Sequence, residues 1–281
     1  MPYSKRIYLG SSLVFLLLFL AACGPSLPAD LFHLIPPDFV SASYFDYEHL
    51  REDPDLNLPS QATQYLCSAL DSPENIDEAL AVVLPSTVTA DSGISISAVG
   101  ICRGNFDQEA IMGQDLVSVL STQKYQGYEL TIFEFGELEM FSSFLDETTW
   151  VLGMSEAGVK AVLDMAKSSE PPPQADLGAA LSDSFIALLL AHCQYEGCDI
   201  RTVLSLEEGT EGSVTTVQLF QFETAEMAAE ALPAVTADFV EGGFFNRVGS
   251  IDITGDSASQ TGRFIRVEGT LPVEDVPNLF K

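Results

Sequence analysis

The chain has 281 residues, with 12 Lys and Arg against 41 Asp and Glu and a formal net charge of −29 at pH 7. A field of that sign repels polyphosphate, so nucleic acid and an anionic bilayer surface are poor partners for the folded body. The hydrophobic fraction of 47% argues against a disordered chain and is sufficient for one large or two modest cores.

The first feature along the chain is an export signal. A basic pair at 5–6 precedes an unbroken apolar run over 13–20, and small residues follow it, which is typical of a secretory signal. The stretch LAAC at 20–23 then resembles the lipobox of bacterial lipoproteins. That resemblance implies cleavage between Ala22 and Cys23 and a diacylglyceryl group on the Cys23 thiol. The alternative, an uncleaved membrane helix, fits less well because a span needs roughly 20 apolar residues.

Lipidation at Cys23 has consequences for location and charge. Acyl chains such as palmitate would hold the protein to a membrane durably, since each buried methylene contributes roughly 0.8 kcal/mol. Removal of residues 1–22 leaves 10 basic and 41 acidic residues, a formal charge of −31. We therefore expect a lipid-anchored protein on the extracytoplasmic side of the cell envelope, with no sign of which membrane carries it.

Four further cysteines, an even number, fit an exported chain. Of the three pairings, we prefer Cys67 with Cys102 and Cys193 with Cys198, because only four residues separate the second pair and a small closed loop is feasible. The alternative is that all four are reduced, small apolar core residues. No CxxC pair or Cys/His tetrad predicts a zinc site.

Helix and strand patterns alternate up to residue 167. Residues 39–47 predict the first strand. Residues 72–84 predict an amphipathic helix, since Ser72 can cap it, Pro73 suits its first position and apolar residues then recur at helical spacing. Further strands are expected at 92–101, 128–135 and 148–154, and further helices at 106–120 and 155–167, the last capped by Ser155.

The clearest break is the segment SSEPPPQADLG at 168–178, whose three consecutive prolines cannot continue a helix. Beyond it a similar order of elements follows. Helices are expected at 181–193 and 224–239, and strands at 199–208, 213–222, 250–255 and 262–269.

The predicted fold class is α+β. We expect two similar two-layer units, each an antiparallel or mixed sheet covered by helices, with internal duplication as a hypothesis. The predicted boundaries are a signal peptide at 1–22, a tether at 23–30, a first unit at 31–167, a linker at 168–178 and a second unit at 179–281.

Three stretches of the mature part resemble a loose family of uncharacterised exported bacterial proteins. They are LIPPDFVSASYFDYEHLREDP at 34–54, KYQGYELTIFEF at 124–135 and FLDETTWVLGMSEAGVKAVLDMAK at 144–167. The resemblance implies a fold and no catalytic residue, because the family has no established activity.

Catalytic patterns are missing from the sequence. His33, His49 and His192 lie far apart and form no metal-binding motif, so we expect no metal and no cofactor. Ser155 is better explained as a helix cap than as a nucleophile, because GMSEAG lacks the GxSxG spacing. The stretch that starts at Asp53 opens like a calcium loop but lacks the required Gly and final Glu, so a turn is expected there.

Aromatic residues give one weak hint of a site. Phe239, Phe244 and Phe245 surround a Gly pair in FVEGGFF. Most such rings belong to a core, but a ligand groove between the two units is the alternative.

We therefore expect a non-catalytic lipoprotein that binds an envelope protein or helps organise the envelope. A module that binds a small lipid-like or aromatic molecule is the alternative. An exported hydrolase ranks last, because no convergent His/Asp/Ser or metal cluster is visible.

Overall fold

The computed structural model of the chain describes residues 29–53, 56, 67, 70–85, 97–169, 175–210, 212–241, 246–248, 251–253 and 255–280. The predicted signal peptide, the Ala22–Cys23 cleavage site and Cys23 itself lie outside this part of the chain. Among the described helices, none has the length and apolarity that crossing a bilayer would require.

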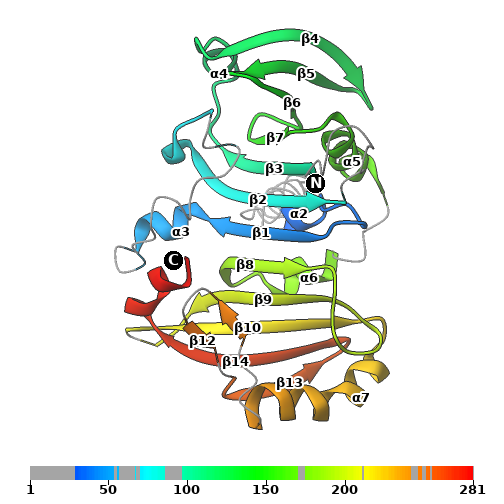
Figure 1. The fold of residues 1–281 in the computed structure, drawn as a ribbon, viewed down its shortest axis with the longest axis vertical. Helices are drawn as coiled ribbons and strands as arrows, with labels where there is room; N and C mark the ends of the chain where they lie inside the picture. Colours follow the sequence, from blue (N-terminus) through cyan, green and yellow to red (C-terminus); the bar gives the residue numbers. More distant parts are fainter. Residues whose placement is uncertain are drawn as a thin grey trace, which may run out of the picture.

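A single twelve-stranded antiparallel sheet forms the body of the molecule (Figure 1). Its spatial order is β13-β14-β10-β9-β8-β1-β2-β3-β7-β6-β5-β4. The strands are β1 (Ser41–Asp46), β2 (Ile76–Leu84), β3 (Ser97–Gly104), β4 (Val117–Tyr125), β5 (Tyr128–Phe135), β6 (Leu138–Phe144), β7 (Thr149–Gly153), β8 (Ser184–Leu190), β9 (Cys198–Glu208), β10 (Ser213–Phe222), β13 (Ser257–Thr261) and β14 (Phe264–Pro272). A separate hairpin pairs β11 (Asn246–Val248) with β12 (Ile251–Ile253).

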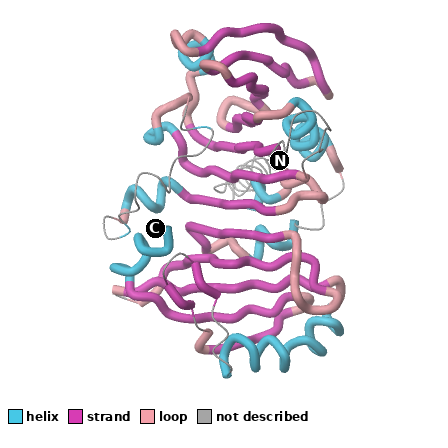
Figure 2. Tube along the Cα trace, viewed as in Figure 1, coloured by secondary structure: helices cyan, strands magenta, loops and turns pink. Residues whose placement is uncertain are grey.

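The helices are short and lie along the sides of the sheet (Figure 2). The α-helices are α2 (Ala29–Phe32), α3 (Tyr47–Glu52), α4 (Gln108–Met112), α5 (Glu156–Lys167), α6 (Ala175–Ala180) and α7 (Ala225–Thr236). Helical segments of other types are the 3₁₀-helical η3 (Pro73–Asn75), the π-helical η4 (Ala237–Glu241) and the 3₁₀-helical η5 (Val273–Phe280).

The two predicted units are halves of this one sheet. They join where β1 pairs antiparallel with β8, with Tyr44 opposite Ala187. Outward from this seam the order is β1-β2-β3-β7-β6-β5-β4 in one half and β8-β9-β10-β14-β13 in the other, so the first half has two more strands. A helix follows the third strand of each half, α4 after β3 and α7 after β10. Duplication remains a hypothesis, and the expectation of two sheets is replaced by one continuous sheet.

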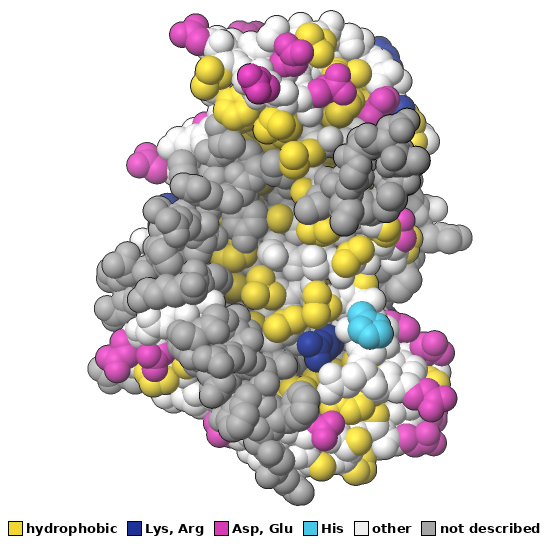
Figure 3. Space-filling model, in the orientation of Figure 1, with side chains coloured by type: hydrophobic (Ala, Val, Ile, Leu, Met, Phe, Trp, Pro, Cys, Tyr) yellow, Lys and Arg dark blue, Asp and Glu magenta, His cyan; other side chains and the backbone are white. Residues whose placement is uncertain are grey.

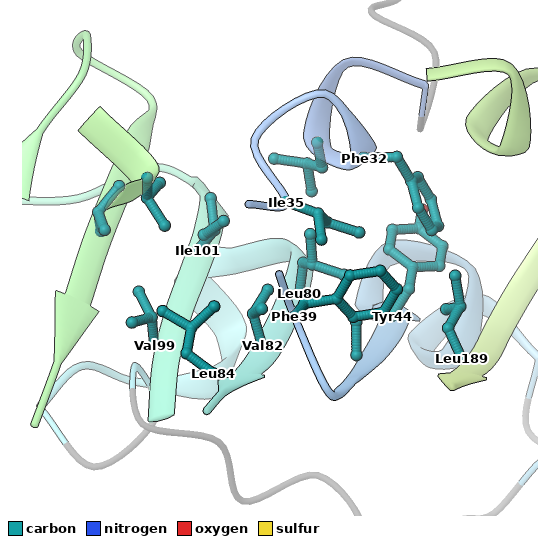
Figure 4. Close-up of a cluster of buried hydrophobic side chains, with 14 of the residues drawn as sticks. Phe32, Ile35, Phe39, Tyr44, Leu80, Val82, Leu84, Val99, Ile101 and Leu189 are labelled. Atoms are coloured by element: carbon teal, nitrogen blue, oxygen red, sulfur yellow. The ribbon is translucent and has the colours of Figure 1, made fainter. Parts of the chain in front are cut away.

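Both faces of the sheet are buried over its centre. Tyr44 of β1 contributes to one apolar cluster and its neighbour Phe45 to the other. Figure 4 shows the first cluster, in which Phe32 and Ile35 from the α2 region pack over Tyr44 and Leu80. A third cluster lies under α7, around Phe220 and Phe222.

Three helix predictions are wrong. Residues 72–84 form η3 and then β2, and most of 181–193 forms β8. In 106–120 only Gln108–Met112 is helical, and β4 begins at Val117. Because β2 and β8 are covered on both faces, their apolar residues do not alternate as in a half-exposed strand.

Other local predictions are confirmed. Ser155 caps α5 as predicted by accepting a hydrogen bond from the Gly158 N–H at 3.1 Å. A helix forms within the predicted range 224–239 as α7, and its N-cap is Thr224, which was not predicted as a cap. The strands at 128–135 and 213–222 have the predicted bounds. The proline-rich linker lies partly outside the described residues, and α6 begins within it at Ala175.

Candidate functional site

A hollow lined by described residues lies at one end of the β1–β8 seam. There β1 ends at Asp46, and α3 begins directly after it. The Asp46 carboxylate caps α3 by accepting the N–H of His49 at 2.8 Å. This cap fixes the first turn of the helix and turns His49 toward β8.

The imidazole of His49 stacks on the ring of Phe185, which β8 supplies from the other half of the sheet. The ring centroids are 4.7 Å apart and the planes are inclined by 16°. His49 Nδ1 lies 3.9 Å from Oε1 of Glu208, the last residue of β9. The Glu208 side chain is 83% exposed and that of His49 only 26%, so the carboxylate forms the outer rim and the imidazole an inner wall.

Two adjoining cavities, of about 230 Å³ and 440 Å³, open on this stack, and both are lined by His49, Phe185 and Glu208. We call them together the seam groove. The remaining lining of the smaller cavity is Asp53, Leu56, Gly209, Thr210, Gly212, Ser213, Val214 and Val273. The remaining lining of the larger cavity is Asp46, Ser182, Asp183, Ser184 and Glu207. The groove thus combines apolar side chains, a ring stack and several carboxylates.

The negative charge of one of these carboxylates, that of Glu207, is already paired with a cation. Glu207 is only 10% exposed in its side chain and receives two hydrogen bonds from the guanidinium of Arg266, which also donates to Glu268 at 2.6 Å. Burial lowers the pKa of Arg266, but the hydrogen bonds that it donates to these two carboxylates, and their negative charges, outweigh burial and raise it. The acidic character of the groove therefore comes from its other carboxylates.

A second cluster of polar side chains lies next to the seam and links β1, β2 and β3. Glu78 of β2 accepts from Arg103 at 2.6 Å and from the Tyr44 hydroxyl at 2.9 Å. Burial is the main cause that raises the pKa of Glu78, although Arg103 and Tyr44 lower it. Burial beside Glu78 also raises the pKa of Tyr44 far above its ordinary range, so its hydroxyl acts as a donor.

The groove does not assemble a nucleophile and its base from the described residues. The hydroxyl of Ser184 is buried and shares a hydrogen bond of 2.6 Å with Ser205. Its other close oxygen is that of Glu207 at 3.5 Å, and His49 is not among its hydrogen-bond partners. No group of three His, Cys, Asp or Glu side chains in the described part of the chain is placed to hold a metal ion.

Of the other residues named in the sequence analysis, the four cysteines form disulfides and two of the histidines lie outside the groove. Two disulfides join Cys67 to Cys102 and Cys193 to Cys198, the pairing preferred from spacing. His33 and His192 are exposed and lie outside the groove.

Of the three rings near FVEGGFF, for which a core role was expected and a ligand groove was the alternative, the structure describes one. Phe239 is buried, and its ring centroid is 5.3 Å from that of Phe220 in the cluster under α7, so it is a core residue. Phe244 and Phe245 lie outside the described residues.

Sequence reasoning missed the seam groove because its walls are far apart in the chain. Only the β1–β8 pairing brings His49 to Phe185. The one local signal was the turn GTEGS after β9, with its two glycines, which supplies part of the smaller cavity.

The view in Figure 3 shows the charge distribution on one face. Acidic side chains gather toward the two ends of the molecule, and hydrophobic side chains occupy a band between them. Basic side chains are few on this face, in keeping with the composition of the chain.

Comparison with known proteins assigns no family. No family model matches the chain, and no curated protein sequence does. Solved structures with a similar chain path are titled crystal forms IV and III of TP0453. Form IV is 11% identical with a TM-score of 0.48, over 89% of this chain and 95% of that chain. Form III is 10% identical with a TM-score of 0.46, over 89% and 96%. Values of this size assign neither a function nor site residues to the chain.

Proposed function

We propose that the chain is an extracytoplasmic lipoprotein, held to a membrane through acyl chains on Cys23, whose body is a non-catalytic module that binds an envelope protein in the seam groove. Two disulfides are consistent with an extracytoplasmic protein, because such bonds persist in oxidising compartments. The lipobox resemblance at 20–23 supports the anchor. The single observation that carries the binding site is the seam groove itself.

The lining of the groove indicates what the partner presents there. Carboxylates of Asp46, Asp183 and Glu208 line a wall beside the His49 ring. A guanidinium or ammonium group could pair with these carboxylates while its aliphatic stem lies against the ring. We therefore propose that the partner inserts a basic side chain, and that the chain's strong negative charge steers the approach.

A small-molecule ligand is the second candidate, and the cavity volumes favour it. A volume of about 440 Å³ lies in the range of small-molecule sites. The carboxylate lining suits a ligand with a positive charge better than the lipid-like or aromatic molecule expected from the sequence. We propose no hydrolase activity, because Ser184 is buried in hydrogen bonds with its own sheet.

The anchor is tested by the intact mass of the full-length protein extracted from the membranes of its host. The expected product begins at Cys23 and carries the mass of a diacylglyceryl group. A product that begins at Met1 would overturn the anchor. Native mass spectrometry of the same preparation tests the second candidate, which requires a stoichiometric adduct that is lost on denaturation.

The groove is tested by cross-linking in intact envelopes with a charge reversal and a matched control. Glu208→Lys places a cation at the rim, and Glu139→Lys makes the same charge change on β6, far from the seam. We expect Glu208→Lys to lose the cross-linked partner and Glu139→Lys to keep it. Equal capture by both variants would refute the groove as the binding site and leave the anchor unaffected.

A further inference from the structure

The two edges of the twelve-stranded sheet differ. One edge is β13, five residues long, and α7 packs beside it (Figure 1). The side chain of Gln260 in β13 donates to the backbone oxygen of Ala225, the first residue of α7, at 3.0 Å. A helix along a short edge strand keeps other strands from pairing with it. This edge is therefore closed.

The other edge is β4, and it is open. β4 has nine residues, and all seven between its two terminal residues are exposed. Exposed apolar side chains gather at its start, where Leu116 is 64% exposed and Val119 and Leu120 are each 49% exposed. In Figure 1 β4 is the outermost strand, and among the strands that the structure describes only β5 pairs with it.

The open edge is held in place. The Tyr125 hydroxyl donates to Asp164 of α5 at 2.9 Å, and the Gln123 amide donates to Glu156 at 2.7 Å. A bulge interrupts the ladder between Val119 and Ser121, but from Ser121 to Tyr125 each residue pairs in register with β5. The outer row of backbone groups along this run is thus presented by a fixed strand.

β4 carries few of the usual defences of an edge, namely one charge at Lys124 and the bulge between Val119 and Ser121. Residues 116–128 contain no Asp or Glu and no Pro, and Lys124 is their one charged residue. Natural edge strands of this length are normally blunted by charges, proline or a covering element. In a chain with 41 acids, an acid-free edge removes the repulsion that would otherwise keep a second copy away at this point.

We propose that β4 pairs antiparallel with β4 of a second copy of the chain, so that the two sheets join across a two-fold axis. With Gln123 at the axis, Lys124 lies opposite Thr122 and Tyr125 lies opposite Ser121, so no like charges face each other. Each copy has one open edge, because α7 closes the other. Pairing through β4 therefore ends at two copies and does not propagate into a fibre.

Sedimentation of the full-length protein in detergent solution tests the pairing. We expect a dimer for the wild type and a monomer for Thr122→Lys, because in this register the new lysine faces Lys124 of the other copy. Thr122 is exposed, so the fold is retained. The matched control is Ser259→Lys on β13, a position that is also exposed. Both variants reduce the negative charge equally, so a loss of dimer in the first alone reports the β4 edge.

A cysteine scan tests the register directly. If residue 123 lies at the axis, the two cysteines of the Gln123→Cys dimer are directly opposed on neighbouring strands. Their Cα atoms are then close enough for a disulfide, and mild oxidation should give a covalent dimer. Ser118→Cys is the control, because the two copies of residue 118 would lie about 33 Å apart along the strands. A monomeric wild type, as expected if β4 binds a strand of another protein, overturns the proposal. Equal dimerisation of both lysine variants, or cross-linking at 118 and not at 123, does the same.

Discussion

Removal of each disulfide in turn should destabilise the fold by different amounts. Cys67 and Cys102 are 35 residues apart in sequence, and Cys193 and Cys198 are 5 apart. A cross-link lowers the entropy of the unfolded chain more when it closes a longer loop. For these separations the loop-closure relation gives about 4 kcal/mol for the first bond and about 2 kcal/mol for the second at 25 °C. The long loop should therefore contribute about 2 kcal/mol more.

The measurement is urea unfolding of the mature protein with each pair replaced by alanine. The free energy of unfolding should fall further for Cys67→Ala, Cys102→Ala than for Cys193→Ala, Cys198→Ala. Cys67 and Cys102 are fully buried, so the void left by two sulfur atoms adds to the first loss and does not reverse the order. An equal or larger loss for the short loop would refute the loop-closure argument.

Four further outcomes are expected. Ser155→Ala should lower the free energy of unfolding by about 1 kcal/mol in urea titrations, because α5 loses its N-cap. Burial raises the pKa of Glu78 above its ordinary 4.5, so the folded state binds its proton more tightly than the unfolded state. Ionisation of Glu78 therefore destabilises the folded state. The free energy of unfolding of the wild type, taken relative to that of the Glu78→Gln variant, should rise as the pH falls from the raised pKa toward 4.5. A difference that falls over this interval would contradict the assigned direction. Arg266→Met should cost about 3 kcal/mol, because Glu207 stays buried without its cation. Lys160→Ala, which breaks an exposed pair within α5, should cost only about 0.5 kcal/mol in the same assay.

Predictions from the sequence succeed where the signal is local. The predicted cap Ser155 precedes a run with apolar residues at helical spacing, and α5 forms there. The helix predicted at 224–239 likewise forms as α7. The strands at 128–135 and 213–222 are rich in aromatic and β-branched residues, which favour a sheet in most contexts.

Predictions fail where the sheet is buried on both faces. The run IDEALAVVL has apolar residues at helical spacing, yet it forms β2, whose buried residues include both Ala79 and Leu80. The run SFIALLL is apolar throughout, and its pattern cannot distinguish a central strand such as β8 from a buried helix. β4, β6 and β13 were missed because their neighbours in the sheet, not their own periodicity, make them strands.

The sequence alone determined what depends on neighbouring residues: the strong negative charge, the cap of α5 and the preferred cysteine pairs. It also predicts an export signal with a lipid site at Cys23. Only the tertiary structure decided the joining of two halves into one sheet, the meeting of His49 with Phe185 and the contrast between the open β4 edge and the covered β13 edge. The physical reason is that these features depend on strand pairing between distant segments. The free energy of that pairing comes from packing on both faces of the sheet, and no short stretch of sequence encodes it.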